Sequence, residues 1–396
     1  MSKKVIKEKR KIALIIETSN SYARGLLHGI RDYTRTCKNW SIYLGEHSRG
    51  KSNPSWLKNW HGDGVIARIE NKNIANFILE SGLPTIDVSS GRYIPSLIWV
   101  ETNDEAIVKL AAEHLISCGL KNFAYCGDPY FNWSKWRKQH FKKFIGDLGY
   151  ECYKYEFNTR GDSKLGWLEE QNRLSNWVIS LPKPIGIMAC YDICGQKLIE
   201  ACRNVDVIVP DEVAIIGVDN DDLLCDLADP PLSSIIPNTY QTGYKAAELL
   251  DKLISGENIS NNTYLIDPIG VASRQSTNIL AIKDKFVADA IKFIHENYNK
   301  NILVKDFLKD IPLSRRVFER RFYKELNRTP YEEIIRLKLT RVKQLLVETD
   351  LPLYMIAKQA GFKHIEYMSS LFKKKIGMPP SHYRVKHKCK YPTSYL

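Results

Sequence analysis

Apolar positions along residues 1–280 follow one recurring pattern. Short apolar runs such as Ile12–Ile16, Gly64–Ala67 and Val213–Val218 are each followed by a stretch in which apolar residues recur three or four positions apart. A short continuous run bounded by polar residues indicates a buried strand, and the wider spacing indicates an amphipathic helix. The alternation predicts parallel strands joined by crossover helices.

The pattern occurs twice, in two halves divided near residue 120. The second half begins with the run Asn122–Gly127 and ends with a helical stretch at Thr242–Ser255. We therefore expect a two-lobed α/β domain over residues 1–280. Ligands of open α/β sheets bind beyond the carboxyl ends of the strands, so the polar residues directly after each apolar run are candidates. These candidates are Ser19–Tyr22, Asn103–Asp104, Trp133–Arg137, Tyr191–Asp192 and Asp219–Asp222.

Two longer segments carry a resemblance to a known family. Glu101–Gly127 and Val209–Asn220 resemble the central signature of LacI-type and periplasmic sugar-binding folds, and the likeness spans residues 10–275. The amino-terminal DNA-binding domain of LacI-type repressors has no counterpart here, because only a basic stub precedes Ile12. The resemblance implies a hinged cleft that closes around a small sugar.

The same resemblance places Arg137, Asp192 and Asp219 at this cleft. A guanidinium group can bridge two neighbouring hydroxyls, and carboxylates accept strong hydrogen bonds from sugar O–H groups. The ring of Trp133 can lie against the apolar face of a pyranose. Each residue taken singly is also compatible with a surface loop or a turn at a strand end. The predicted ligand-binding residues are Ser21, Tyr22, Asn103, Trp133, Arg137, Asp192, Asp219 and Asn220.

The last part of the chain repeats one helical unit at an offset of 50 residues. In the first copy Ser314 is a good N-cap for a helix at Arg315–Leu326, and in the second copy Gly361 precedes a helix at His364–Lys375. A longer helix at Pro330–Glu348 separates the two copies. This pattern predicts an all-α domain with two helix-turn-helix units. The repeat is carried by Leu303, Phe318, Phe322, Lys324, Leu326 and Pro330, matched by Leu353, Met368, Phe372, Lys374, Ile376 and Pro380.

All of the excess positive charge lies in this repeated part. Residues 1–284 contain 34 Lys and Arg against 34 Asp and Glu, whereas residues 285–396 contain 24 against 11, which accounts for the net charge of +13. Charge confined to one domain indicates a polyanionic partner, because each neutralised phosphate releases counterions. Charge alone is equally compatible with a solvated surface that maintains solubility.

The segment Ile356–Arg384 resembles the AraC-type DNA-binding signature, which covers residues 285–385. The resemblance implies that a rigid pair of units inserts two recognition helices into successive major grooves of DNA. Arg316 and Arg320 share a helix face and are expected to read bases, Glu319 can accept a hydrogen bond from cytosine, and lysines 373–375 are expected to contact phosphates. The alternative is a helical bundle with a basic face. The predicted DNA-binding residues are Ser314, Arg315, Arg316, Glu319, Arg320, His364, Glu366, Tyr367, Ser370, Lys373 and Lys374.

Several classes of protein are disfavoured by the sequence. The chain contains neither an apolar run of membrane-spanning length nor a recognisable signal peptide, so we expect a cytoplasmic protein without a membrane partner. The nine cysteines show no metal-ligand spacing, and we expect neither a metal nor a cofactor. A sugar-processing enzyme that uses Asp192 and Asp219 is the first alternative, but phosphate-loop, nucleophile-elbow and zinc-protease motifs are absent. The second is a protein that compacts nucleic acid without sequence specificity.

A sugar sensor followed by an AraC-type domain resembles the bacterial regulators of pentose operons, and this likeness extends over nearly the full chain. It implies D-xylose as the effector and an activator of pentose-catabolism genes. It also implies a homodimer that binds bipartite operator half-sites and works with RNA polymerase. Another sugar stays an alternative, because a few cleft side chains suffice to change the preferred ligand.

Overall fold

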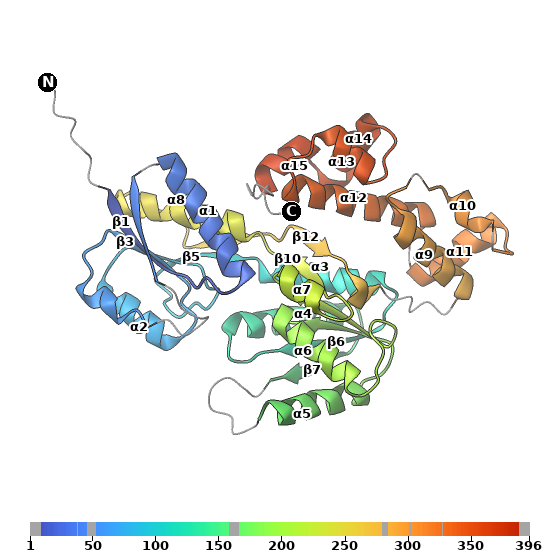
Figure 1. The fold of residues 1–396 in the computed structure, drawn as a ribbon, viewed down its shortest axis with the longest axis horizontal. Coiled ribbons are helices and arrows are strands. Elements are labelled where there is room, and N and C mark those ends of the chain that lie inside the picture. Colours follow the sequence, from blue (N-terminus) through green and yellow to red (C-terminus); the bar gives the residue numbers. More distant parts are fainter. Residues whose placement is uncertain are drawn as a thin grey trace.

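The computed structural model describes residues 9–37, 39–45, 53–157, 166–278, 284–300, 302–309, 311–326 and 328–387. Two six-stranded sheets, each with its own helices, form two neighbouring lobes, and a group of helices from the end of the chain lies beside them (Figure 1). The predicted fold class is therefore confirmed.

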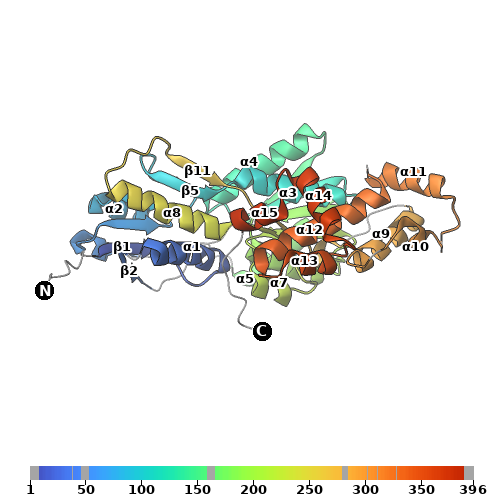
Figure 2. The ribbon, with the colours of Figure 1, turned by 90° about the horizontal axis from the view of Figure 1, so that it is seen from above.

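The first sheet is entirely parallel and has the order β11-β5-β4-β3-β1-β2. Side chains of a strand alternate between the two faces of its sheet. Ile12 and Leu14 accordingly pack with helices α1 and α8, while Ala13 and Ile15 pack with α2. Seen from above, α1 and α8 lie side by side (Figure 2). The elements of this lobe are β1 (Arg10–Ile15), α1 (Ser21–Cys37), β2 (Trp40–Leu44), β3 (Gly64–Ala67), α2 (Lys72–Ser81), β4 (Thr85–Asp87), β5 (Ile98–Thr102), α8 (Thr239–Ile254) and β11 (Thr263–Ile266).

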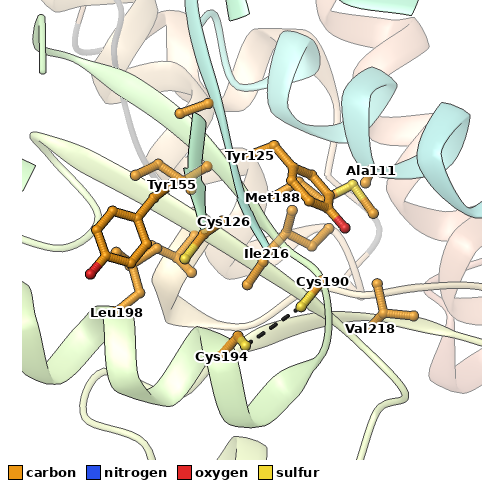
Figure 3. Packing of buried hydrophobic residues seen from close by; sticks show 14 of the residues in the cluster. Ala111, Tyr125, Cys126, Tyr155, Met188, Cys190, Cys194, Leu198, Ile216 and Val218 are labelled. Atoms are coloured by element: carbon orange, nitrogen blue, oxygen red, sulfur yellow. Dashed lines mark hydrogen bonds between the residues drawn. The ribbon is translucent and has the colours of Figure 1, made fainter. Parts of the chain in front are cut away.

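The second sheet has the order β12-β10-β9-β8-β6-β7, and only the pairing of β12 with β10 is antiparallel. Its buried core includes Tyr125, Met188 and Ile216 from three neighbouring strands (Figure 3). Helix α3 packs against α4, and α5 packs against α6. The elements are α3 (Asp104–Ser117), β6 (Asn122–Gly127), α4 (Asn132–Asp147), β7 (Cys152–Glu156), α5 (Trp167–Ser180), β8 (Ile185–Ala189), α6 (Asp192–Arg203), β9 (Val213–Val218), α7 (Asp222–Leu227), β10 (Ser233–Ile236) and β12 (Gly270–Ala272).

The chain crosses between the two sheets at three places. It leaves the first sheet after β5, returns between β10 and α8, and crosses again between β11 and β12. The first crossing lies at Asn103, which differs from the predicted division near residue 120, because α3 already belongs to the second lobe. The helix expected at Thr242–Ser255 to complete the second half packs instead on the first sheet as α8.

The final part of the described chain is helical and contains the two predicted helix-turn-helix units. Helix α12 runs between the units (Figure 1) and begins with a capping box formed by Thr329 and Glu332. Gly361 has a φ of +77°, and a Cβ there would lie 2.6 Å from the carbonyl oxygen of Tyr298, so this turn requires glycine. The helices are α9 (Lys285–Asn297), α10 (Val304–Leu308), α11 (Arg315–Leu326), α12 (Pro330–Glu348), α13 (Leu353–Gln359), α14 (Ile365–Ile376) and α15 (Pro380–His387).

Each unit has its own hydrophobic core. Phe318 and Phe322 of α11 are fully buried with residues of α9 and α10, and Met368 and Phe372 of α14 are fully buried with residues of α12 and α13. These are the positions that the 50-residue repeat predicted to face inward. The second core also contains Ile269, which belongs to the segment between β11 and β12.

Candidate functional sites

A narrow cleft lies between the lobes at the carboxyl ends of the parallel strands. Its side chains leave a free volume of only about 10 Å³, so the two lobes lie close together here. Four of the eight predicted ligand-binding residues line it, together with four residues that the sequence did not single out. The lining residues are Tyr22, Trp133, Arg137 and Asp219, and in addition Arg68, Ser89, Ser90 and Thr102.

Arg137 is held firmly at the base of this cleft. Its Nε donates to Oδ1 of Asp104 at 2.7 Å, and its Nη1 donates to the carbonyl oxygen of Cys190 at 2.6 Å. Burial alone would lower the pKa of Arg137, but the charges of Asp104 and Asp219 outweigh burial and raise this pKa above its usual value. The guanidinium therefore stays charged, in a fixed orientation suited to paired hydroxyl groups.

Trp133 forms an aromatic wall beside Arg137. Its ring stacks on Phe131 with centroids 4.9 Å apart and meets the ring of Tyr191 edge-on at 5.7 Å. The Arg137 guanidinium carbon lies 4.8 Å from the Trp133 ring centroid. This packing fixes the indole, so it can hold a flat ligand face with little loss of side-chain entropy.

Arg68 is the main cleft residue that the prediction missed. It is 4% exposed, pairs with Glu17, and donates from Nη2 to Oε1 of Glu70 at 2.7 Å. Its guanidinium carbon lies 4.8 Å from the ring centroid of Tyr22, whose pKa burial raises to about 12. Arg68 directly follows the apolar run Gly64–Ala67, so the rule applied to the other strands would have found it.

The structure does not place the remaining four predicted residues in the cleft lining. Asp192 is 2% exposed and lies beneath the cleft, where Oδ1 accepts from Ser234 at 2.6 Å and Oδ2 accepts from the backbone N–H of Asp221 at 2.8 Å. Burial, and secondly the charge of Asp219, raise the pKa of Asp192 well above its ordinary value. Asn220 accepts from Arg274 at 2.9 Å. In these contacts Asp192 and Asn220 support the loop that carries Asp219.

Ser21 and Asn103 lie where the lobes meet. The backbone N–H of Ser21 donates to Asp221 of the other lobe at 3.2 Å. Asn103 accepts from the backbone N–H of Ala106 as the N-cap of α3, and its Nδ2 donates to Oδ1 of Asp267 at 2.9 Å. Through these hydrogen bonds, Ser21 and Asn103 help to fix the position of one lobe relative to the other.

Further hydrogen bonds join the lobes through residues next to the cleft lining. Nδ2 of Asn132 donates to the carbonyl oxygen of Gly91 at 2.8 Å, and Nε1 of Trp136 donates to that of Ser90 at 3.4 Å. The guanidinium carbon of Arg92 lies 5.3 Å from the ring centroid of Trp99 and 5.7 Å from that of Trp136. Because Trp99 and Trp136 belong to different lobes, these contacts form only when the lobes are close together.

The second candidate site consists of the outer faces of α11 and α14. Arg315, Arg316 and Arg320 of α11 are exposed, and Arg315 forms an ion pair of 2.8 Å with Glu319. The hydroxyl of Ser314 accepts from the backbone N–H of Val317 at 3.4 Å, as expected of an N-cap. Arg316 and Arg320 lie one helical turn apart with no acidic partner among the contacts of the described residues, so both can face a partner.

Helix α14 presents a different set of side chains. Tyr367 exchanges a hydrogen bond with the hydroxyl of Tyr331 at the start of α12, which ties this face to the connecting helix. The last turn carries three exposed lysines, 373–375. All of the residues predicted for this unit are exposed: His364, Glu366, Tyr367, Ser370, Lys373 and Lys374.

Over the described ranges, no cluster of three His, Cys, Asp or Glu side chains is arranged to hold a metal ion. In the same part of the chain, no helix combines the length and apolarity needed to cross a membrane.

Comparison with known families covers most of the chain. Residues 11–104 match a model described as the XylR N-terminal domain, residues 112–277 match a periplasmic binding protein-like domain, and residues 309–386 match a helix-turn-helix domain. The three matches follow the order of the first lobe, the second lobe and the paired helical units.

Whole-length relatives and solved structures agree with these matches. The xylose operon regulatory protein of Haemophilus influenzae is 32% identical over 383 residues, which is 95% of this chain and 98% of the relative. The protein of the same name from Escherichia coli K12 is 29% identical, over 95% of this chain and 97% of its own. A structure titled as the xylose-binding transcription activator xylR is 28% identical, has a TM-score of 0.62, and matches over 96% of this chain and 99% of its own. These relatives are named as transcriptional regulators and not as enzymes. The chain therefore belongs to the family of xylose operon regulatory proteins.

Proposed function

We propose that this protein is a D-xylose-responsive transcriptional activator. In this proposal D-xylose binds in the cleft between the lobes, and α11 and α14 bind operator DNA. The observation that carries the proposal is the whole-length match to xylose operon regulatory proteins, since it includes both lobes and the paired helical units in one order. The match of one solved structure with xylose in its title supports the choice of sugar.

The chemistry of the cleft supports a small polyhydroxylated ligand. Arg137 and Arg68 supply planar donor groups on opposite lobes, Asp219 supplies an acceptor, and Trp133 supplies a flat apolar surface. Sugars are bound by this combination, because O–H groups need directed partners while ring C–H groups need an apolar contact. We propose Tyr22 as a further cleft contact.

The chemistry of the helical domain supports double-stranded DNA as its partner. Helix α12 runs between the two units, and a rigid pair of units can place two recognition helices in successive major grooves. Arg316 and Arg320 are suited to guanine edges in the major groove. The lysines at the end of α14 are suited to phosphates.

Regulation requires that the sugar distinguish between two states of the protein. A ligand shifts such an equilibrium only by its differential affinity for the two states. The contacts of Asn132 and Trp136 across the cleft exist when the lobes are close, so a sugar that bridges the lobes favours this closed state. We further propose that the protein acts in the cytoplasm as a homodimer and recruits RNA polymerase at its operators.

Calorimetric titration of the purified protein with D-xylose, L-arabinose, D-ribose and D-glucose tests the effector. Operator binding is then measured with and without the preferred sugar. We expect selective D-xylose binding and a sugar-dependent change in operator affinity. Preference for another of these sugars would overturn the effector and keep the architecture. Binding of none of them, or equal affinity for random DNA, would overturn the function.

A further inference from the structure

The second helix-turn-helix unit packs directly on the sensor, and the contact lies where the chain crosses between lobes. Ile269 is 6% exposed and belongs to the same core as Ile335 and Leu339 of α12. By contrast, the core of the first unit draws only on positions from Val287 to Ile334 among the residues that the structure describes. The two units are thus held to the sensor in different ways.

Ile269 lies in one of the segments that connect the lobes. β11 of the first lobe ends at Ile266 and β12 of the second begins at Gly270, so only residues 267–269 link them. Asp267 in this link accepts from Asn103, which lies in another crossing segment. The backbone N–H of Ile269 donates to the carbonyl oxygen of Ile236 at 2.8 Å, just before the crossing between β10 and α8. A rotation of one lobe against the other must therefore change the backbone around Ile269.

The last helix of the second unit holds the same residue through its backbone. The hydroxyl of Tyr383 in α15 donates to the carbonyl oxygen of Ile269 at 3.2 Å. The ring of Tyr383 packs edge-on against Phe372 of α14, with centroids 5.3 Å apart. Tyr383 thus joins the link between the lobes to the helix that carries the candidate base-reading residues of the second unit.

A separate contact anchors the helical domain to the body of the second lobe. Nη2 of Arg328 donates to the carbonyl oxygen of Ser117 at the end of α3, at 2.7 Å. Arg328 also pairs with Glu333, which is buried and pairs with Arg336. Between α3 and α12 lies a hollow of about 350 Å³, so this interface is less tightly filled than a protein core. Two attachments on parts that move differently, joined by a loosely filled interface, allow the helical domain to shift when the lobes move.

We propose that Tyr383 and Ile269 are positioning residues that transmit the state of the cleft to the second helix-turn-helix unit. This inference rests on the proposed function and adds the path of contacts by which a change in the cleft reaches the DNA-binding helices. Opening or closing of the lobes moves residues 267–269, and the core around Ile269 and the hydroxyl of Tyr383 carry that movement to α15 and α14.

Tyr383→Phe tests this route, because it removes only the hydroxyl and keeps the ring on Phe372. Operator affinity is measured with and without D-xylose for the full chain, and D-xylose affinity is measured with and without operator. The coupling factor is the ratio of operator affinity with D-xylose to operator affinity without it. Thermodynamic linkage requires the same factor for the effect of operator on D-xylose affinity. We expect Tyr383→Phe to reduce this factor roughly two- to twelvefold, the range for one net hydrogen bond. Affinity for D-xylose without DNA is expected to stay at the wild-type value.

Matched variants separate transmission from a general structural effect. Tyr354→Phe removes a hydroxyl from an exposed tyrosine of the same unit and is expected to keep the wild-type coupling factor. Ile269→Ala is expected to reduce the factor further, and Ile269→Val is expected to restore most of it, because valine keeps a branched side chain in the core.

The outcomes distinguish this inference from the proposed function. If wild-type operator affinity does not respond to D-xylose, the proposed function falls and this route falls with it. If D-xylose changes the operator affinity of the wild type and changes that of Tyr383→Phe and Ile269→Ala equally, only the proposed transmission through Ile269 and Tyr383 is refuted. A loss of coupling with unchanged D-xylose affinity in both variants supports it.

Discussion

Asp219 offers the sharpest test of the cleft. It lies at the end of β9 beside Arg137, in a left-handed conformation with a φ of 108°. Asparagine has nearly the same shape and tolerates positive φ, so Asp219→Asn removes the charge with little strain. Arg137 keeps Asp104 as its ionic partner in this variant, so the guanidinium stays anchored at the base of the cleft.

The magnitude follows from the hydrogen bond that Asp219 is proposed to accept from a sugar hydroxyl. A bond to a charged group contributes about 1.5–3 kcal/mol, and one between neutral groups contributes about 0.5–1.5 kcal/mol. Asp219→Asn keeps a neutral acceptor, so the loss of about 1–1.5 kcal/mol corresponds to a roughly 5- to 12-fold weaker Kd. Asp219→Ala removes the acceptor, and the expected loss is about 12- to 150-fold.

Calorimetry with D-xylose measures both variants against a matched control. Asp211 is exposed and precedes β9, whereas Asp219 follows it, so Asp211→Asn removes the same charge at the opposite end of one strand. We expect this control to bind D-xylose with the wild-type Kd. A Kd for Asp219→Asn and Asp219→Ala equal to that of the control would refute the placement of this carboxylate on the sugar.

Three further predictions concern DNA binding, pH and domain stability. Arg320→Ala should weaken operator binding by about 1–3 kcal/mol and relax the preference at one base pair; an equal loss on random DNA in the same titrations would contradict base recognition. Burial raises the pKa of Asp87 to about 7. The folded state therefore keeps a proton on Asp87 at a pH where the unfolded state has released it. The stability that comes from this bound proton is lost as pH rises towards 7. The Tm of Asp87→Asn relative to the wild type should therefore increase between about pH 5 and pH 8, and a constant difference would count against the shift. Phe318→Ala removes a fully buried ring from the first unit and should destabilise that unit by about 3–5 kcal/mol. It should abolish operator binding while the Kd for D-xylose stays unchanged, and a loss of both activities would show that the parts do not fold separately.

The strands that could be predicted from the sequence are those buried on both faces. Gly64–Ala67 and Val213–Val218 are buried at every position, and such strands produce continuous apolar runs. Strand β2 was missed because only its first residue, Trp40, is buried. Strand β11 was missed for a similar reason, since none of its residues is fully buried.

The division of the lobes could not be derived from local patterns. β11 pairs with β5 through Thr263 and Trp99, which lie far apart in the sequence. A hydrophobic pattern identifies a strand but not its neighbour, so it gives no information on which sheet the returning segment joins. Only the pairing shows that Asn103 and Asp267 meet where the chain crosses.

The cleft could be predicted in part, because position in the fold and chemical role are separate properties. The rule that candidate residues follow parallel strands selected Arg137 and Asp219, which line the cleft. It also selected Asp192, whose two carboxylate oxygens are engaged by Ser234 and Asp221 beneath the cleft. Sequence position does not distinguish a carboxylate that lines the cleft from one that supports the loop above it.

The repeated helical units show which part of a duplication is retained and which part is free to differ. At the offset of 50 residues Phe318 corresponds to Met368 and Phe322 to Phe372, and all four are fully buried. The outer positions differ, because Arg316 corresponds to Glu366 and Arg320 to Ser370. Arginine reads guanine through two acceptors, whereas glutamate accepts from cytosine and serine makes contacts of low specificity. Two such faces, held apart by α12, cannot recognise the same base sequence, so the two halves of a bipartite site for this protein should differ from each other.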